Sequence, residues 1–275
     1  MKTFAQIRTV VMALTVVAGA GTSALADFNY SDFSSVSGLN FVGVAKQDAN
    51  RILVTPSVGG SAGAVWAATK QSVANGFDTT MTIHIEDKHG GGADGMALVI
   101  QNAAPTPLGG TGGGIGYGRN LVYGQPGIAN SFAVVADMWN NNPQWTEPGD
   151  NHLTFQSNGL LENSPSSSAS LANAGISDLS GGSTHTVRVL YAGGVMSVYL
   201  DGSLSASLSA EVNLSTLLAL DNGSAWVGVT SSTGGTADRQ AHVLDAWSWT
   251  TSVTPAPGAA GLMAMGGLLA IRRKR

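Results

Sequence analysis

The sequence of 275 residues contains no cysteine and few charged residues, which make up only 11% of the chain. The absence of cysteine excludes a disulfide framework and any metal site built from thiolates. Glycine, by contrast, occurs 37 times, and serine, threonine, asparagine and valine are abundant. Good helix formers are sparse outside the two ends, so the composition favours strands and turns over helices. The length is sufficient for one large β-domain with a sizeable core.

Basic residues are scarce in the body of the chain. Six of the 13 Lys and Arg residues lie within the segments 1–26 and 252–275, and neither of these segments contains an acidic residue. The remaining chain carries seven basic against 17 acidic residues, a net charge of −10. Recognition of nucleic acid requires clustered Lys and Arg side chains. The acidic body therefore argues against nucleic acid as a partner.

The first 26 residues have the pattern of a secretory signal peptide. Lys2 and Arg8 form a charged beginning, residues 10–20 are apolar, and Ala24-Leu25-Ala26 is a small-residue cleavage site before Asp27. The alternative is a membrane anchor, which is disfavoured because the apolar run is shorter than the ~20 residues that a membrane span needs. We therefore expect export of the protein.

The last 24 residues form a second distinct segment, 252–275. A Pro255-Ala256-Pro257-Gly258 sequence precedes an apolar stretch, 259–271, and a basic end, 272–275. This order resembles the PEP-CTERM type of bacterial sorting tail, which implies processing by an exosortase-like membrane peptidase. Location at the cell surface or outside the cell follows, with transient anchoring through the tail. The alternative is an ordinary tail anchor, which so short a stretch would span poorly.

Short apolar segments separated by turn residues fill the chain between 39 and 249. Residues 77–85 alternate apolar and polar side chains, which predicts a strand with one buried face. Residues 96–100 are apolar on both faces, which predicts a central strand covered on both sides. Residues 186–191 and 195–200 flank a hairpin signal rich in glycine. The stretch 157–180, rich in serine and asparagine, is interpreted as a loop.

One polar stretch, 131–152, has the residues of a calcium loop. An apolar strand ends at Asp137, and Trp139, Asn141 and Glu147 follow. Ca²⁺ takes six to eight oxygen ligands, and alternate residues of an extended chain share a face. Carboxylates of Asp137 and Glu147, the amide oxygen of Asn141 and the backbone carbonyl of Trp139 would supply four of them. On spacing alone, a polar turn rich in asparagine is an equally good interpretation.

This stretch resembles the metal loop of the legume-type (L-type) lectins. That family has a strand ending Glu-aromatic-Asp, followed by an aromatic residue, Asn, Asp-Pro and a His. Asp137, Trp139, Asn141, Glu147-Pro148 and His152 fall on the matching positions. Two residues depart from the pattern, because Val135 replaces the first Glu and Glu147 replaces an Asp. The resemblance implies a Ca²⁺ site and, in the family, a second site for Mn²⁺ or another transition metal that uses His152; without a carboxylate at 135 that second site is incomplete.

The resemblance also implies a sugar site. In this family an Ala-Asp-Gly sequence, here Ala93-Asp94-Gly95, carries a sugar-binding aspartate after a cis peptide bond. Taken alone, Asp-Gly is a common turn dipeptide. The resemblance further implies backbone N–H donors in two glycine-containing loops, an amide donor on Asn141 and a ring that packs on the sugar. The implied carbohydrate-binding residues are Asp94, Gly113, Trp139, Asn141, Gly235 and Thr236.

The resemblance spans roughly residues 39–249 and implies an all-β fold, an antiparallel β-sandwich of the jelly-roll kind in one domain, 27–251. We expect a secreted or surface protein that binds glycans or exopolysaccharide with the help of calcium and is not an enzyme. One alternative is a structural surface or matrix protein that keeps the fold without sugar binding. Another is a secreted glycan hydrolase, which needs two carboxylates facing one bond; no strand carries such a closely spaced set. The sequence leaves the oligomeric state open.

Overall fold

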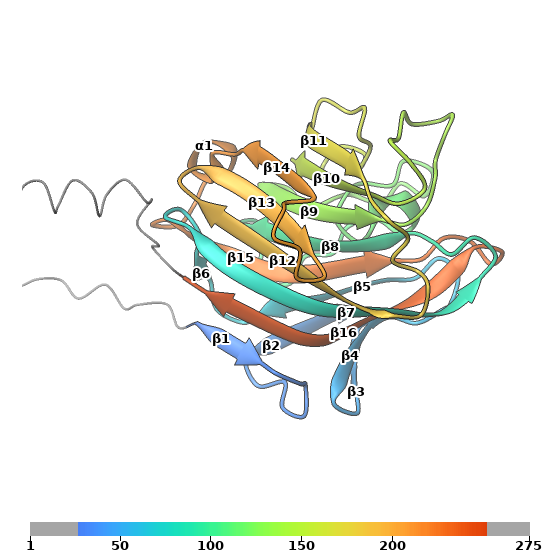
Figure 1. The fold of residues 1–275 in the computed structure, drawn as a ribbon, viewed down its shortest axis with the longest axis horizontal. Coiled ribbons are helices and arrows are strands. Elements are labelled where there is room, and N and C mark those ends of the chain that lie inside the picture. The colour runs from blue at the N-terminus through green and yellow to red at the C-terminus, as the bar shows by residue number, and fades with distance from the viewer. Residues whose placement is uncertain (1–26, 252–275) are drawn as a thin grey trace, which may run out of the picture.

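The computed structural model describes residues 27–251, which form two antiparallel sheets packed face to face (Figure 1). The predicted antiparallel β-sandwich is therefore confirmed. The proposed signal segment, 1–26, and sorting tail, 252–275, lie outside the described residues. The described part contains only two short helical turns, η1 (Gly112–Gly114) and α1 (Leu214–Leu217). Among residues 27–251, no helix has the length and apolar character needed to cross a membrane.

The first sheet, called the β7 sheet, has seven strands in one path and β1 (Phe28–Tyr30) beside β16. In spatial order the path is β14 (Leu208–Glu211), β13 (Val195–Leu200), β12 (Thr184–Ala192), β7 (Phe77–His89), β16 (Arg239–Thr250), β4 (Arg51–Thr55) and β3 (Lys46–Asp48). Along β7 the side chains alternate between buried and partly exposed up to Ile85. This confirms the predicted strand with one buried face.

The second sheet, called the β8 sheet, holds the strands whose ends matter most below. In spatial order it consists of β11 (Ser170–Gly175), β10 (His152–Ser157), β9 (Ser131–Asp137), β8 (Gly95–Gln101), β15 (Ser224–Ser232), β5 (Ala62–Ala67) and β2 (Leu39–Gly43). A short strand, β6 (Gln71–Ser72), pairs with β15.

The β8 sheet is covered on both faces, and two hydrophobic clusters show how. The inner cluster fills the space between the sheets and includes Phe77 and Trp249, whose stacked rings lie 4.3 Å apart. The outer cluster lies on the other face, where Ile115 and Tyr117 from the glycine-rich loop pack with Val135. Every residue of β8 is therefore buried, as its apolar sequence predicted.

One sequence interpretation was wrong. The stretch 157–180 was interpreted wholly as a loop, but residues 170–175 form the edge strand β11, which pairs with β10. Apart from Leu171, its side chains are small or polar, and the residues alternate between partly buried and exposed positions. Such residues have little intrinsic preference for strands, so pairing with β10, rather than local sequence, accounts for the strand.

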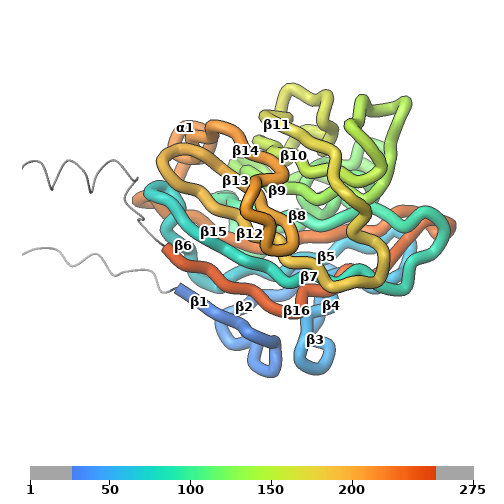
Figure 2. The backbone as a smooth tube through the Cα atoms, in the orientation of Figure 1, coloured from blue at the N-terminus to red at the C-terminus, as the bar shows by residue number. Residues whose placement is uncertain are grey.

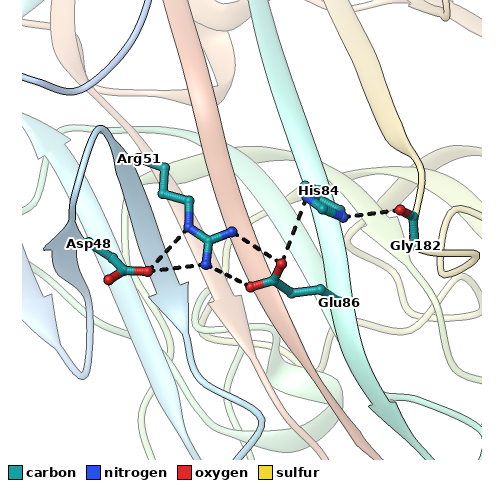
Figure 3. A network of polar contacts seen from close by, with 5 residues as sticks. All are labelled: Asp48, Arg51, His84, Glu86 and Gly182. Atoms are coloured by element: carbon teal, nitrogen blue, oxygen red, sulfur yellow. Dashed lines mark hydrogen bonds and ion pairs between the residues drawn. The ribbon is translucent and has the colours of Figure 1, made fainter.

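The β7 sheet carries a network of polar contacts (Figure 3). Arg51 donates two hydrogen bonds to the Glu86 carboxylate, at 3.1 and 2.9 Å, and also contacts Asp48. The ring of His84 lies between the carboxylate of Glu86, at 3.9 Å, and the carbonyl oxygen of Gly182, at 3.1 Å. The guanidinium of Arg51 thus already pairs with the Glu86 carboxylate.

Candidate functional site

Four strand ends of the β8 sheet lie side by side. Gly95, at the start of β8, pairs with Asp137 at the end of β9 and with Ser232 at the end of β15. Asp137 also pairs with His152, the first residue of β10. Asp94, which precedes β8, therefore lies beside the end of β9 although the two residues are far apart in the sequence.

The backbone of Asp94 is fixed on both sides. Its N–H donates to the carbonyl of Ser232 at 3.0 Å, and its own carbonyl accepts from the N–H of Met138 at 2.7 Å. The Ala93–Asp94 peptide bond is cis, as the sequence resemblance predicted. The side chain of Asp94 is only 3% exposed. A carboxylate is thus held rigidly at the junction of β8, β9 and β15.

The loop after β9 folds back on itself. The backbone N–H of Asn141 donates to Glu147 Oε2 at 2.5 Å, and its side-chain Nδ2 donates to Glu147 Oε1 at 3.0 Å. Asn142 adds two further bonds to the backbone of Glu147, at 3.3 and 3.1 Å. At the start of the loop, the N–H of Trp139 donates to Asp137 Oδ1 at 3.0 Å. These bonds bring Glu147 back to the end of β9.

The result is a buried cluster of possible metal ligands. One ligand atom each from Asp137, Glu147 and His152 lies within 4.8 Å of the others, and all three side chains are buried. The second carboxylate oxygens of Asp94 and Asp137 are also buried, and neither has a hydrogen-bond partner among residues 27–251. No salt bridge of the described chain reaches Asp94, Asp137 or Glu147. Unpaired buried carboxylates are costly, and a cation bound among them would offset that cost.

The electrostatics of the site support the same conclusion. Burial, and then repulsion by Glu147 and Asp94, raise the pKa of Asp137 well above its ordinary value. Burial followed by repulsion from Glu147 and Asp238 raises the pKa of Asp94 to about 7. Burial also raises the pKa of Glu147, and it lowers that of His152. The acidic groups thus interact unfavourably with each other, and a divalent cation among them would reverse that interaction.

The donor set fits a hard divalent cation. Carboxylate and amide oxygens are the ligands that Ca²⁺ prefers, whereas a histidine nitrogen suits a transition metal. The structure brings together Asp137, Asn141, Glu147 and His152, four of the five predicted metal ligands. The fifth predicted contribution is a backbone carbonyl at Trp139, which begins the same loop. In this arrangement the amide NH₂ of Asn141 donates to Glu147 rather than facing outward.

Val135 is buried in the outer hydrophobic cluster, two residues before Asp137 on the same face of β9. It pairs across the sheet with Thr154, whose side-chain hydroxyl has no partner among the described residues. The position where the family pattern has a carboxylate is therefore occupied here by an apolar side chain, Val135, and its cross-strand neighbour, Thr154, is polar. The cluster of ligands ends at Asp137 and does not extend along β9.

The predicted backbone donors lie in two loops around Asp94. Gly235 and Thr236 are exposed in the loop between β15 and β16, and their N–H groups donate to no group of the described chain. The neighbouring Gly234 lies closest to the site, because a Cβ atom there would lie 3.5 Å from Asp94 Oδ2. The N–H of Gly113, in η1, likewise has no acceptor within residues 27–251.

Two tryptophan rings flank the site on different sides. The Trp139 ring packs over the loop between β7 and β8, where a Cβ on Gly91 would lie 2.5 Å from its Cζ3. The Trp145 ring covers Gly113, where a Cβ would lie 2.7 Å from its Cη2. Sequence reasoning missed Trp145, although an aromatic residue within a polar loop was a usable signal.

Sequence reasoning also missed Asp238 and Gln240. Asp238 accepts a hydrogen bond from the N–H of Gly91 at 2.8 Å, which ties together the two loops beside Asp94. Gln240 lies beneath them, fully buried, and donates to the sulfur of Met138 at 3.3 Å. Both residues come from β16 or the loop before it, far from Asp94 in the sequence, so no local pattern pointed to them.

Comparison with known proteins matches this architecture. The profile of the Legume lectin beta-barrel domain matches residues 28–246. A lectin from Bauhinia forficata in complex with GalNAc has a TM-score of 0.65 at 23% identity, with 82% of this chain and 96% of that chain covered. Lectin I-B4 from Griffonia simplicifolia, in its metal-free form, has a TM-score of 0.66 at 22% identity, covering 82% and 98%. Arcelin-5, a lectin-like defense protein from Phaseolus vulgaris, has a TM-score of 0.62 at 17% identity, covering 82% and 96%.

Proposed function

We propose, because the chain belongs to the family of the legume lectin beta-barrel (L-type lectin) domain, that it binds carbohydrate with the help of calcium. The observation that carries this proposal is the pair of buried, unpartnered carboxylate oxygens on Asp94 and Asp137, beside Glu147. Without a ligand these buried oxygens have no partner and destabilise the folded protein, whereas a bound cation and a bound sugar would supply partners for them.

In this proposal Asp137, Asn141 and Glu147, with the carbonyl of Trp139, hold the calcium ion. The ion supplies positive charge that neutralises the buried carboxylates and fixes the loop after β9. With Glu147 engaged by the ion, the NH₂ group of Asn141, which now donates to Glu147 Oε1, is free for a ligand. His152 completes the wall of the site, and the apolar Val135 leaves a second, transition-metal site short of one ligand.

Sugar recognition would then rest on Asp94 and on backbone donors. The Asp94 carboxylate accepts hydrogen bonds from sugar hydroxyls, and its fixed backbone keeps it in place without a further loss of entropy. The N–H groups of Gly113, Gly235 and Thr236 are available as donors. The ring of Trp139 offers an apolar face of the kind that packs against the C–H groups of a sugar.

We also propose that the protein is exported and sorted to the cell surface. The support is the sequence alone: a signal-peptide pattern in 1–26, and a Pro-Ala-Pro-Gly sequence, an apolar run and a basic end in 252–275. Processing by an exosortase-like peptidase follows from that resemblance. Mass spectrometry of the native extracellular protein tests it, because peptides from 259–275 should be missing; an intact end would contradict it.

A non-enzymatic role is part of the proposal. A glycan hydrolase needs two carboxylates facing one bond, and no strand carries such a closely spaced set. On β7, the carboxylate of Glu86 is paired with Arg51 (Figure 3). The purified protein should therefore release no reducing ends from polysaccharides. Steady turnover that survives re-purification would contradict this reading.

Binding to a glycan array tests the central proposal, with the protein in calcium, in EDTA and after calcium is restored. The array should include N-acetylgalactosamine and methyl α-D-galactoside, the sugars bound by two relatives. Binding should disappear in EDTA and return with calcium. Asp94→Asn should lose sugar binding while retaining calcium-induced thermal stabilisation. If calcium neither binds nor stabilises the protein and no glycan is retained, the alternative of a structural surface or matrix protein is the better one.

A further inference from the structure

A groove of about 300 Å³ lies beside the candidate sugar site. Its walls include Arg119, Leu121, Trp145, Leu161 and Glu162, together with serines between 164 and 168. The volume lies at the lower end of the range of small-molecule pockets, ~300–1,000 Å³. Apart from Trp145, none of these residues has a part in the calcium and sugar site described above.

The groove and the candidate site share the wall formed by Trp145. The N–H of Trp145 donates to the carbonyl of Asn141 at 3.1 Å, and the Trp145 ring covers Gly113. From the other side, Asn163 donates its side-chain NH₂ to the carbonyl of Gly113 at 3.3 Å. Trp145 thus contacts Gly113, a proposed sugar donor, and also lines the groove, so the two sites adjoin each other.

The walls of the groove are held together before any ligand arrives. The N–H of Arg119 donates to the carbonyl of Leu161 at 3.2 Å, and its guanidinium donates to that of Leu160 at 3.3 Å. The loops after β8 and β10 are therefore fixed to each other. Figure 2 shows the loops after β9 and β10, in green to yellow, projecting from the same side of the molecule. A rigid groove of this kind loses little entropy on binding.

The chemistry of the groove suits a sugar ring. A half-buried aromatic face lies beside hydroxyl groups, and Arg119 and Glu162 form no salt bridge with another described residue. Aromatic faces bind the apolar C–H face of a sugar, while hydroxyls and charged groups bind its rim. A purely apolar or strongly basic partner would match only part of this lining.

Leu121, which lines the groove, begins a run of three consecutive exposed apolar side chains. Leu121 is 53%, Val122 80% and Tyr123 70% exposed, in a turn closed by pairing of Asn120 with Gln125. A single exposed apolar residue needs no explanation, but a contiguous group next to a groove marks a binding surface.

We propose that this groove is a second sugar subsite, so that the ligand is an oligosaccharide with one ring at Asp94 and the next on Trp145. The proposal rests on the carbohydrate-binding function proposed above and specifies its ligand class. The length of the glycan, rather than only its terminal sugar, then decides affinity.

Calorimetry with the full-length protein in calcium tests the proposal. The probes are methyl glycosides of glucose, mannose, galactose and N-acetylgalactosamine, and disaccharides that carry each of these sugars at the non-reducing end. For at least one sugar, the disaccharide should bind about tenfold more tightly than the methyl glycoside, as expected for one aromatic contact. Equal affinities for both forms of every sugar that binds would overturn the proposal.

Two variants locate the gain. Ser168→Trp places a large side chain in the groove from an exposed position, away from Asp94 and the calcium residues. It should reduce the disaccharide to the affinity of the methyl glycoside and leave the methyl glycoside unaffected. Trp145→Ala should also remove the gain. A gain that survives Ser168→Trp overturns the second subsite and leaves the carbohydrate function standing, whereas no binding of any probe overturns the function itself. Trp226→Ala, which alters a tryptophan packed under Lys70, serves as the control.

Discussion

Asp137 at the end of β9 lies directly opposite His152 at the start of β10, and Glu147 folds back between them. The loop that carries Trp139, Asn141 and Trp145 thus begins and ends at residues that lie close together. The side chains at this point, Asp137, Glu147 and His152, are of the types that bind cations. Any ion held there would fix the loop and, through it, the contact with Gly113. Metal binding and sugar binding are therefore expected to be linked in this chain.

The first prediction concerns Asp137. In Asp137→Asn the calcium affinity should fall below detection in the millimolar range, because one buried carboxylate with neutral oxygens supplies too little charge for a hard divalent ion. Calcium at about 100 times its dissociation constant stabilises a folded protein by ~2.7 kcal/mol, so the wild type should melt at higher temperature in calcium than in EDTA. The variant should melt at one temperature in both. Differential scanning calorimetry measures this.

The melting temperature of the same variant in EDTA serves as the control. Removing one of three mutually repelling acidic groups should not lower the melting temperature of the calcium-free protein. A large loss of stability without calcium would mean that Asp137 has a structural role independent of any ion, and the loss of calcium binding would then have no bearing on ligation.

The second prediction concerns Val135. Because His152 faces Asp137, Val135→Glu should add affinity for Mn²⁺ by supplying the missing carboxylate on the same face of β9. Val135→Gln is the matched control, since it has nearly the same shape without the charge. Both variants should lose stability, by about 1–3 kcal/mol, from placing a polar group in the outer cluster. Titration calorimetry with Mn²⁺ should show binding by the Glu variant alone; equal binding by both would contradict the assignment.

Sequence reasoning predicted the parts of this molecule that depend on neighbouring residues. The alternation along β7 and the apolar run of β8 gave two strands, because burial follows a short period along a strand. The edge strand β11 was missed because its small residues have no strong preference of their own. Trp145 over Gly113 was missed because the contact joins two loops. The role of Asp94 as a sugar-binding residue was predicted from the family resemblance and not from the spacing of residues.

The third prediction concerns Gly113. Gly113→Ala places a methyl group where the Trp145 ring now lies, since its Cβ would be 2.7 Å from that ring. The ring must move, so sugar binding should weaken while calcium-induced stabilisation stays. Gly181→Ala is the control, because a Cβ there meets open space and its backbone has no unusual conformation. Unchanged sugar affinity in Gly113→Ala would mean that the position of the Trp145 ring has no influence on sugar binding.

The last prediction concerns His242, which is fully buried between Thr55 and Gln240. Burial lowers its pKa from an ordinary value near 6.5 to about 3, so the ring stays neutral in the folded protein over most of the acid range. Between these two values the unfolded chain takes up a proton that the folded chain does not. Stability from this residue is thus complete above pH 6.5 and is lost as the pH falls.

The size of this effect is up to about 1.4 kcal/mol per pH unit, so His242 should remove about 3 kcal/mol of stability between pH 7 and pH 4. Raised pKa values at Asp94 and Asp137 act in the opposite direction, and a comparison of two proteins cancels them. His242→Gln keeps a buried polar group that does not titrate. Urea unfolding in EDTA at pH 7, 5.5 and 4 should show a steeper loss for the wild type than for the variant. Parallel curves would mean that the ring accepts a proton inside the folded protein in spite of its burial.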